Sequence, residues 1–404
     1  MTTPSGPIVF NANTGSDTQA SGLGPVVAVY GSGGSTTATS AVVSGIDTTG
    51  VNVGDLLWVQ SSSGRQFSVI ASVDSISQVT CDETFDNTET VNWAIGGKRA
   101  NLSSAIELFD YYLNSYRFWE IELETDQSLT TMHPTGSNTI GVSIKSSVPG
   151  TKRNLIFNDQ YALRGGTWEL HDLALSTLYT ASNAYLCISS NSGSIFNTGV
   201  YAYDCDFVDP VNQFGILAYN TARAASFYFY GCRFMNFQTY ILQNHAVAEF
   251  RRCYIANNTT ATYCFAITNT GSALWKFHDC IIANNRGWMY PRNGYYGSAI
   301  GTIVYNTSDY LLGAVTPGKN QIREFERCIF INNAGAVSSN FQHAMMHQCA
   351  FYNNANINAT TGDYRNIGNI DLTADPFVNA SAGDFNLNNI IGGGATLKGI
   401  EYTL

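Results

Sequence analysis

The sequence predicts an all-β protein whose main part, residues 100–404, is a right-handed parallel β-helix. A cysteine-centred motif recurs along the second half of the chain at spacings of 27, 21, 27, 48 and 21 residues. The composition agrees, because 44% of the residues are apolar, only 12% are charged and 37 glycines supply turns. A repeat of about 20–30 residues built from short apolar strands is typical of a solenoid.

Each copy of the motif has an apolar residue, two polar or small residues, a cysteine and, two positions later, an aromatic residue or isoleucine. Alternate residues of a strand point to the same side, so the cysteine and the residue two positions after it both face inward. The apolar residue three positions before the cysteine is out of phase, which requires a corner between them. We therefore predict an inward column of free thiols, made of Cys205, Cys232, Cys253, Cys280, Cys328 and Cys349.

Pairs of asparagines follow most copies of the motif and mark the next corner. Asparagine tolerates left-handed backbone, and stacked asparagine side chains can bond to one another along the axis. The remainder of each repeat contains a further apolar strand and a polar corner, which predicts three strands per rung. The predicted asparagine stack consists of Asn257, Asn284, Asn332 and Asn353.

The 48-residue spacing is interpreted as one rung enlarged by two loops, residues 286–297 and 308–320. The first loop is crowded with aromatic residues, which serve protein interfaces and sugar binding alike. We expect contact with a neighbouring subunit or virion protein, and the alternatives are sugar binding and a self-packed loop. Its aromatic residues are Trp288, Tyr290, Tyr295 and Tyr296.

The open ends of a solenoid must be covered. Ser104 and Glu107 form a capping box, which predicts an amphipathic capping helix at about 104–115. Before it, residues 1–99 contain short strands broken by turn residues, so we expect a small β-rich module that attaches the chain to a particle. The segment from about 366 to 404 is expected to close the other end.

From the helix onward, the chain resembles the pectate-lyase-like superfamily of right-handed parallel β-helices. The resemblance lies in the capping helix, the three-strand rungs and the cysteine, aromatic and asparagine stacks. The segment at 371–389, DLTADPFVNASAGDFNLNN, resembles the last rung of bacterial and phage β-helix proteins, although GGGATLKGI replaces the usual Ser-Pro. A small β module ahead of such a helix is similar to phage tailspikes. The resemblance implies the fold and leaves the function open among lyases, hydrolases, adhesins and spikes.

The resemblance implies two kinds of site: polysaccharide lyases of this shape use clustered acids to hold Ca²⁺ with arginine or lysine as base, whereas hydrolases use paired carboxylates. The candidates here are Asp204, Asp206, Asp209, Arg233 and Arg252. Neighbouring rungs bring the arginines beside the aspartates, and the resulting contacts are either a metal-and-base site or cross-rung ion pairs on a solvated face. We favour ion pairs, and we therefore lean against an enzyme and expect no cofactor.

The histidines His278 and His347 share one corner position, interpreted as two rungs apart with Glu326 between them. Corner residues are usually solvated, so we expect no metal there.

An outward apolar strip is predicted on the later rungs, because the positions one and three after each cysteine are apolar there. A monomer rarely exposes such a strip. Either the C-terminal tail or a loop covers it, or it is a subunit interface, which we favour. The strip includes Ile281, Ile329, Ile331 and Tyr352.

The net charge of −10 argues against binding nucleic acid, and no apolar run is long enough to span a membrane. No signal peptide is visible and the thiols look unpaired. We therefore expect a phage virion surface protein (a spike, fibre or capsid decoration) that folds in the host cytoplasm. Its expected partners are copies of itself, as a homotrimer, and other virion proteins through the N-terminal module, with a host glycan as a further candidate. The alternatives are a polysaccharide-degrading β-helix enzyme and a bacterial surface adhesin.

Overall fold

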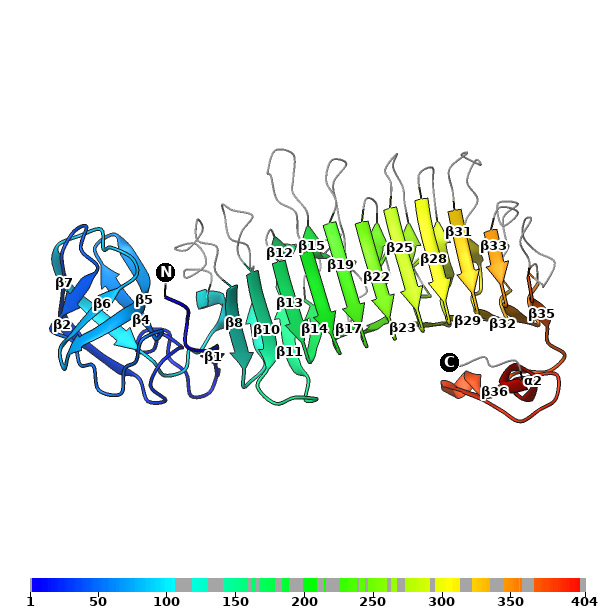
Figure 1. The fold of residues 1–404 in the computed structure, drawn as a ribbon, viewed down its shortest axis with the longest axis horizontal. Coiled ribbons are helices and arrows are strands. Elements are labelled where there is room, and N and C mark those ends of the chain that lie inside the picture. The colour runs from blue at the N-terminus through cyan, green and yellow to red at the C-terminus, as the bar shows by residue number, and fades with distance from the viewer. Residues whose placement is uncertain are drawn as a thin grey trace. The chain divides into compact units, whose positions relative to one another are not determined.

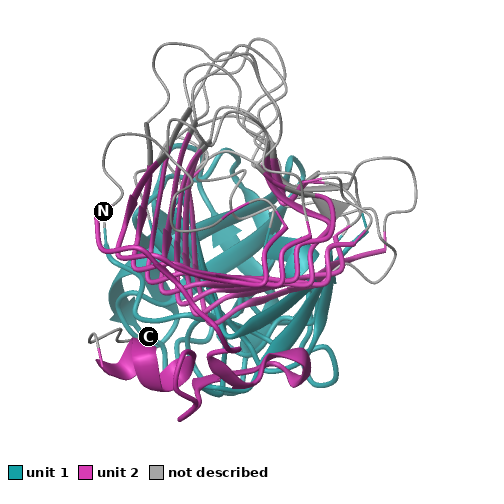
Figure 2. Ribbon diagram, turned by 90° about the vertical axis from the view of Figure 1, so that its right-hand side faces the viewer, with its two compact units in different colours: residues 1–175 teal, residues 176–404 magenta. Residues whose placement is uncertain are grey.

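The computed structural model describes residues 2–105, 118–129, 141–158, 161–164, 167–178, 184–188, 199–208, 214–215, 225–237, 240–243, 246–259, 263–266, 273–290, 295–312, 322–334, 344–355, 357 and 367–399. The chain divides into two compact units, residues 1–175 and 176–404, coloured separately in Figure 2. Among the described residues, no helix is long and apolar enough to cross a membrane.

The first unit contains a closed antiparallel barrel. Its strands follow the order β2-β3-β6-β5-β4-β7 around the barrel, in agreement with the short strands expected in residues 1–99. Apolar residues such as Val59, Ile70 and Trp93 fill its interior. The strands are β2 (Val29–Thr36), β3 (Val42–Ser44), β4 (Leu56–Ser61), β5 (Gly64–Ser75), β6 (Gln78–Cys81) and β7 (Glu89–Ile95).

Parallel strands complete the first unit. The strand β1 (Ile8–Phe10) comes before the barrel in sequence, yet it pairs in parallel with β8 (Phe118–Leu123). Residues 1–99 therefore supply β1 to the parallel sheet as well as forming the barrel. The attachment role expected for these residues stays a prediction. The other elements are η1 (Leu102–Ser104), β9 (Gln127–Leu129), β10 (Gly141–Ser146), β11 (Arg153–Phe157), β12 (Tyr161–Arg164), β13 (Thr167–His171) and β14 (Leu173–Thr177). Most of the predicted capping helix lies outside the described residues.

The second unit is a parallel β-helix with three strands per rung, which confirms the predicted fold (Figure 1). The first face consists of β16 (Gly199–Tyr203), β19 (Ala225–Tyr230), β22 (Ala246–Arg251), β25 (Ala273–His278), β28 (Tyr295–Ile300), β31 (Ile322–Glu326) and β33 (Ala344–His347). The second consists of β17 (Asp206–Val208), β20 (Arg233–Met235), β23 (Tyr254–Ala256), β26 (Ile281–Ala283), β29 (Ile303–Tyr305), β32 (Ile329–Ile331), β34 (Ala350–Tyr352) and β35 (Ile370–Asp371). On the third lie β15 (Ala184–Ile188), β18 (Phe214–Gly215), β21 (Leu242–Gln243), β24 (Phe265–Ala266), β27 (Gly287–Tyr290) and β30 (Tyr310–Leu312).

The motif cysteines lie at the corner between the first and second faces. Each cysteine whose side chain the structure describes is free and buried. In five of them the thiol lies 3.2–3.4 Å from a carbonyl oxygen of the preceding rung, as Cys253 does with Phe229. Burial raises the pKa of the Cys253 and Cys328 thiols well above the ordinary value, so these thiols stay protonated.

At this corner, the residue immediately before each inward-facing cysteine or threonine has left-handed backbone, with φ between 51° and 66°. Glycine occupies two of these positions, Gly231 and Gly301, where it adopts the left-handed backbone without steric cost. A Cβ at Gly231 would lie 2.2 Å from the Asp204 carboxylate, and one at Gly301 would lie 2.5 Å from that of Asp279. The residues with this backbone are Asp204, Gly231, Arg252, Asp279, Gly301, Arg327 and Gln348.

The two asparagines of each pair have different roles at the next corner. The first has left-handed backbone, with φ of 61° at Asn257, 54° at Asn284, 53° at Asn332 and 48° at Asn353. Its side chain is at the surface, where Asn353 donates to the Asn332 side chain at 2.8 Å. The second points inward: Asn333 is 1% exposed and donates to the Asn354 side chain and to the Val304 carbonyl. The buried ladder is therefore made by the second asparagine of each pair.

The interpretation of the 48-residue spacing as one enlarged rung is wrong. The register pairs β25 with β28 and β28 with β31, so two rungs fill the interval. Thr302 occupies the cysteine position of the additional rung and is fully buried, with its hydroxyl 3.2 Å from the Ile300 carbonyl. A threonine in place of the cysteine hid this rung in the sequence.

The C-terminal segment covers the outward apolar strip. We define the closing segment as residues 372–397, which contains β36 (Phe377–Asn379), η3 (Ala380–Ala382), β37 (Asp384–Leu387) and most of α2 (Gly394–Gly399). One apolar cluster joins this segment to the second face of the β-helix, and Tyr305 contacts Phe385 edge to face at 5.6 Å. The expected subunit interface through Ile281, Ile329, Ile331 and Tyr352 is therefore wrong, because these side chains belong to this cluster within the chain.

Candidate ligand-binding surface

Four tyrosines lie on the outer side of β16 and β19, and we call them the tyrosine surface: Tyr201, Tyr203, Tyr228 and Tyr230. They alternate with buried residues such as Phe227 and Phe229, so strand geometry places the tyrosines outward.

The register places the tyrosines in a two-by-two array. Tyr201 pairs with Tyr228 and Tyr203 pairs with Tyr230. The rings of Tyr201 and Tyr228 stack at 5.6 Å with an interplanar angle of 13°. Tyr228 and Tyr230 are 43% and 39% exposed, and the Arg252 guanidinium lies over the Tyr230 ring, 5.7 Å from its centroid. Tyr228 is therefore the tyrosine of this array that is most open to a ligand.

A glutamate borders the tyrosine surface on the next rung. Glu249 pairs with Tyr228 across β19 and β22, and its side chain is only 9% exposed. It accepts a hydrogen bond of 2.5 Å from Nε of Arg251, while Nε2 of His278 lies 3.9 Å from the same oxygen. Figure 1 shows the three strands β19, β22 and β25 side by side.

The surroundings of Glu249 favour its ionised form. Burial opposes ionisation, but hydrogen bonds from Tyr228 and Arg251 outweigh it, and the pKa of Glu249 lies below its ordinary value. The same hydrogen bond to Glu249 raises the pKa of Tyr228. A general acid in glycoside hydrolysis requires a raised pKa, so this carboxylate suits the orientation of a ligand better than proton donation.

The acidic candidates predicted from the sequence do not form one site. Asp206 pairs with Arg233 across neighbouring rungs, with Nη1 3.6 Å from Oδ2, as the ion-pair interpretation expected. Arg252 turns instead to Tyr230, where its Nη1 donates to the phenol oxygen at 2.9 Å. Asp204 occupies the left-handed corner position described above, and Asp209 lies outside the described residues.

The two histidines are further apart than expected. Along the first face, Ile300 and Glu326 lie between His278 and His347, so three rungs separate them. The two-rung spacing inferred from the sequence is wrong for the same reason as the enlarged rung.

Trp288 is not part of an outward loop. It lies on β27, is fully buried, and its ring contacts Phe277 at 5.5 Å and Phe325 at 5.9 Å. The interface prediction is therefore wrong for Trp288, whose substitution would damage the core. The other predicted loop residues fall on strands, Tyr290 on β27 and Tyr295 and Tyr296 on β28, and their side chains lie outside what the structure describes.

The tyrosine surface has a simple signal in the sequence that the motif analysis missed. Tyr201 and Tyr203 lie four and two positions before Cys205, and Tyr228 and Tyr230 lie at the same distances before Cys232. Extending the repeat alignment four residues toward the N-terminus would have predicted an exposed tyrosine array.

Comparisons with known proteins find distant similarity to solved structures. No family model matches the chain, and no curated protein is similar to it in sequence. Among solved structures, a pectin methylesterase from Aspergillus niger, in its deglycosylated form, is 14% identical, with 60% of this chain and 84% of that chain covered and a TM-score of 0.39. The tailspike protein gp49 from Pseudomonas phage LKA1 is 12% identical, with 87% of this chain covered and a TM-score of 0.21. The match spans 61% of the tailspike, less than two thirds of its length.

Proposed function

We propose that the chain is a β-helical surface protein of a phage particle and that it contacts a host glycan through the tyrosine surface. The observation that carries the glycan contact is the stacked pair of Tyr201, which is half-buried, and Tyr228, which is exposed, beside the ionised Glu249. Aromatic rings offer apolar faces to the C–H groups of sugars, while a carboxylate accepts hydrogen bonds from sugar hydroxyls.

The ionised Glu249 and the ion-paired Asp206 favour binding of a glycan without its cleavage. Cleavage by paired carboxylates requires one group that is protonated at neutral pH, whereas hydrogen bonds hold Glu249 ionised. Asp206 is already engaged by Arg233. A rigid scaffold that presents fixed aromatic rings is sufficient for adhesion.

The virion part of the proposal depends on the thiols. Buried free cysteines suit a chain that folds in a reducing cytoplasm, and particles released by lysis carry such a chain to the outside without secretion. Within this proposal the N-terminal barrel attaches to other virion proteins and the chain assembles as a homotrimer.

The test of glycan contact is an array of surface polysaccharides probed with the purified chain. The double variant Tyr201→Ala, Tyr228→Ala should lose at least about fivefold in affinity, since each ring contributes roughly 0.5–1.5 kcal/mol. Phe118→Ala removes another exposed aromatic ring, which is 46% exposed, and should leave binding unchanged. Equal binding by the double variant, or no binding by the wild type, would refute the glycan contact.

Two further measurements test the remainder of the proposal. New reducing ends or unsaturated sugars released from a bound polysaccharide would favour the degrading enzyme. Antibodies against the purified chain should label intact phage particles, and labelling of bacterial surfaces in the absence of phage would favour the adhesin.

A further inference from the structure

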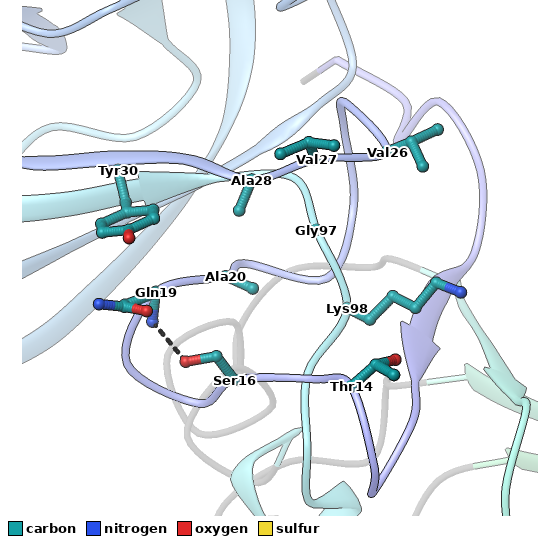
Figure 3. Close-up of a pocket in the computed structure, with 10 residues that line it drawn as sticks. All are labelled: Thr14, Ser16, Gln19, Ala20, Val26, Val27, Ala28, Tyr30, Gly97 and Lys98. Carbon is teal, nitrogen blue, oxygen red and sulfur yellow. Dashed lines mark hydrogen bonds between the residues drawn. The ribbon is translucent and has the colours of Figure 1, made fainter.

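A pocket of about 350 Å³ lies in the first unit, beside the N-terminal end of strand β2. Figure 3 shows Tyr30 and Ala28 on one side of it, with Gln19, Ala20 and Ser16 opposite. This volume suits a ligand of one or two sugar rings. The pocket belongs to the first unit and the tyrosine surface belongs to the second, so the inference does not rest on the proposed function.

The pocket keeps its shape because small residues line one part of it. Gly97 has φ of 68°, and a Cβ there would lie 2.6 Å from the Ala28 Cβ and 3.1 Å from that of Ala20. Any larger residue at Gly97 would therefore displace the lining.

Several polar side chains in the lining make no hydrogen bond within the described part of the chain. The Gln19 side-chain amide, the Tyr30 hydroxyl and the Thr14 hydroxyl make no hydrogen bond to any part of the chain that the structure describes. The Ser16 hydroxyl oxygen, in contrast, already accepts from the Gln19 backbone N–H at 3.0 Å, a bond that shapes the loop. The pocket thus offers both donors and acceptors to a ligand.

The same lining is apolar on its remaining sides. Val26 and Val27 are 88% and 79% exposed, and the Tyr30 ring is 52% exposed. An aromatic ring and two valines beside uncommitted hydrogen-bonding groups match a molecule with apolar C–H faces and many hydroxyls.

The charge at the pocket is balanced. Lys98 is the charged residue among those lining it, and its ammonium lies 2.6 Å from a carboxylate oxygen of Glu124. The hydrogen bonds from Asn11 and Lys98 hold the pKa of Glu124 below its ordinary value, so this carboxylate favours its ionised form beside the Lys98 ammonium. A bound anion would have to compete with Glu124 for this ammonium.

We propose that this pocket binds a small neutral polyhydroxylated ligand the size of a hexose, through the Tyr30 ring and the Gln19 amide. The probes are galactose and galacturonic acid, which share one ring and differ by a carboxylate. Saturation-transfer NMR on the full chain should show galactose binding with a Kd on the order of 1 mM, and galacturonic acid binding no more tightly.

Two variants at exposed side chains test the assignment. Tyr30→Ala should weaken galactose binding by about tenfold and Gln19→Ala by about fivefold, with unchanged melting temperatures. Tyr228→Ala, on the tyrosine surface, should leave it unaltered. Because these variants affect different units, failure here and failure of the proposed function are distinguishable.

Three results would overturn the inference. The first is no saturation transfer from the wild-type chain to galactose. The second is a signal that Tyr228→Ala abolishes and Tyr30→Ala does not, which would assign the sugar to the other surface. The third is binding of galacturonic acid alone with loss in Lys98→Met, which would make the pocket an anion site.

Discussion

Single residues at the first corner decide how the rungs stack. The position that faces inward there is small and adjacent to a carbonyl of the preceding rung, and a thiol fits because it is compact and only weakly polar. Cys280 is 1% exposed, and its sulfur lies 3.4 Å from the Phe250 carbonyl.

Replacing Cys280 with Asp should be severely destabilising, because a carboxylate would be buried without a counter-charge. Cys280→Ser is the matched control and should cost much less, since a hydroxyl can still donate to the Phe250 carbonyl, as Thr302 does with the Phe277 carbonyl one rung further on. Urea denaturation of both variants is the measurement. Comparable midpoints for Cys280→Asp and wild type would mean that the column is not buried.

Glu249 should make stability depend on pH. Its folded-state pKa lies below the ordinary value of 4.5, so it contributes stability that is fully present above pH 4.5 and is lost as the pH falls through the folded-state pKa. Glu249→Gln should be less stable than wild type at neutral pH, and the difference should shrink in acid. Denaturant midpoints at both pH values measure this, with the exposed Glu324 as the control position for Glu324→Gln. A difference that is constant with pH would show that the hydrogen bonds do not hold the ionised form.

At the scale of elements, the closing segment packs against the second face of the second unit. It covers the apolar strip of the second face, and the Phe385 ring contacts Tyr305 of that face at 5.6 Å and Phe377 of the same segment at 5.2 Å. Covering this strip prevents the apolar association that an exposed face invites.

Phe385→Ser should cost about 3 kcal/mol and release the closing segment. The exposed strip should then increase self-association over that of the wild type, which sedimentation velocity would detect. Ile391→Ser is the control, because Ile391 belongs to the same segment but is 88% exposed. If Phe385→Ser sediments as the wild type does, the segment is not what keeps the strip covered.

The buried asparagine ladder shows a second element-level pattern. Asn258 donates to the Asn285 side chain, and Asn333 donates to the Asn354 side chain, at 2.9 Å in each case. Thr307 interrupts the ladder between Asn285 and Asn333, and its buried hydroxyl makes no hydrogen bond in the described part of the chain. The additional rung is thus irregular at both corners, which explains why it was missed in the sequence.

At the scale of the whole molecule, the order of the N-terminal elements along the chain decides which of them can be removed without damage to the parallel sheet. Strand β1 is buried, with Ile8 and Phe10 at most 1% exposed. It precedes the barrel in sequence and pairs with β8, which follows the barrel. The barrel is therefore an insertion between a strand of the parallel sheet and the rest of that sheet, and removal of residues 1–97 would also remove β1.

Two truncated chains distinguish the barrel from β1. A chain in which a short glycine–serine linker replaces residues 20–96 keeps β1 and should retain a cooperative melt. A chain that begins at Lys98 exposes the apolar edge that β1 covers, and it should melt at lower temperature or aggregate. Circular dichroism melts of both compare them directly, and equal melts would show that β1 adds nothing to stability.

The sequence by itself determined the architecture. The cysteine period, the alternation around it and the asparagine pairs were sufficient for three-strand rungs, because each rung repeats the same local steric demands on a few positions. Inward and outward positions followed from strand alternation, and so did the cross-rung pairing of Asp206 with Arg233.

Only the tertiary structure decided what covers each outward surface. Strand alternation predicts that Ile329 and Ile331 point outward, but it does not predict whether solvent, another subunit or the closing segment covers them. Their cover depends on where the closing segment, which is distant in sequence, packs in the folded chain. Trp288 was misplaced because the rung that contains Thr302 lacks the motif cysteine, so its strands looked like loops. Local periodicity records which way a side chain points, whereas burial under a distant segment is a property of the folded chain alone.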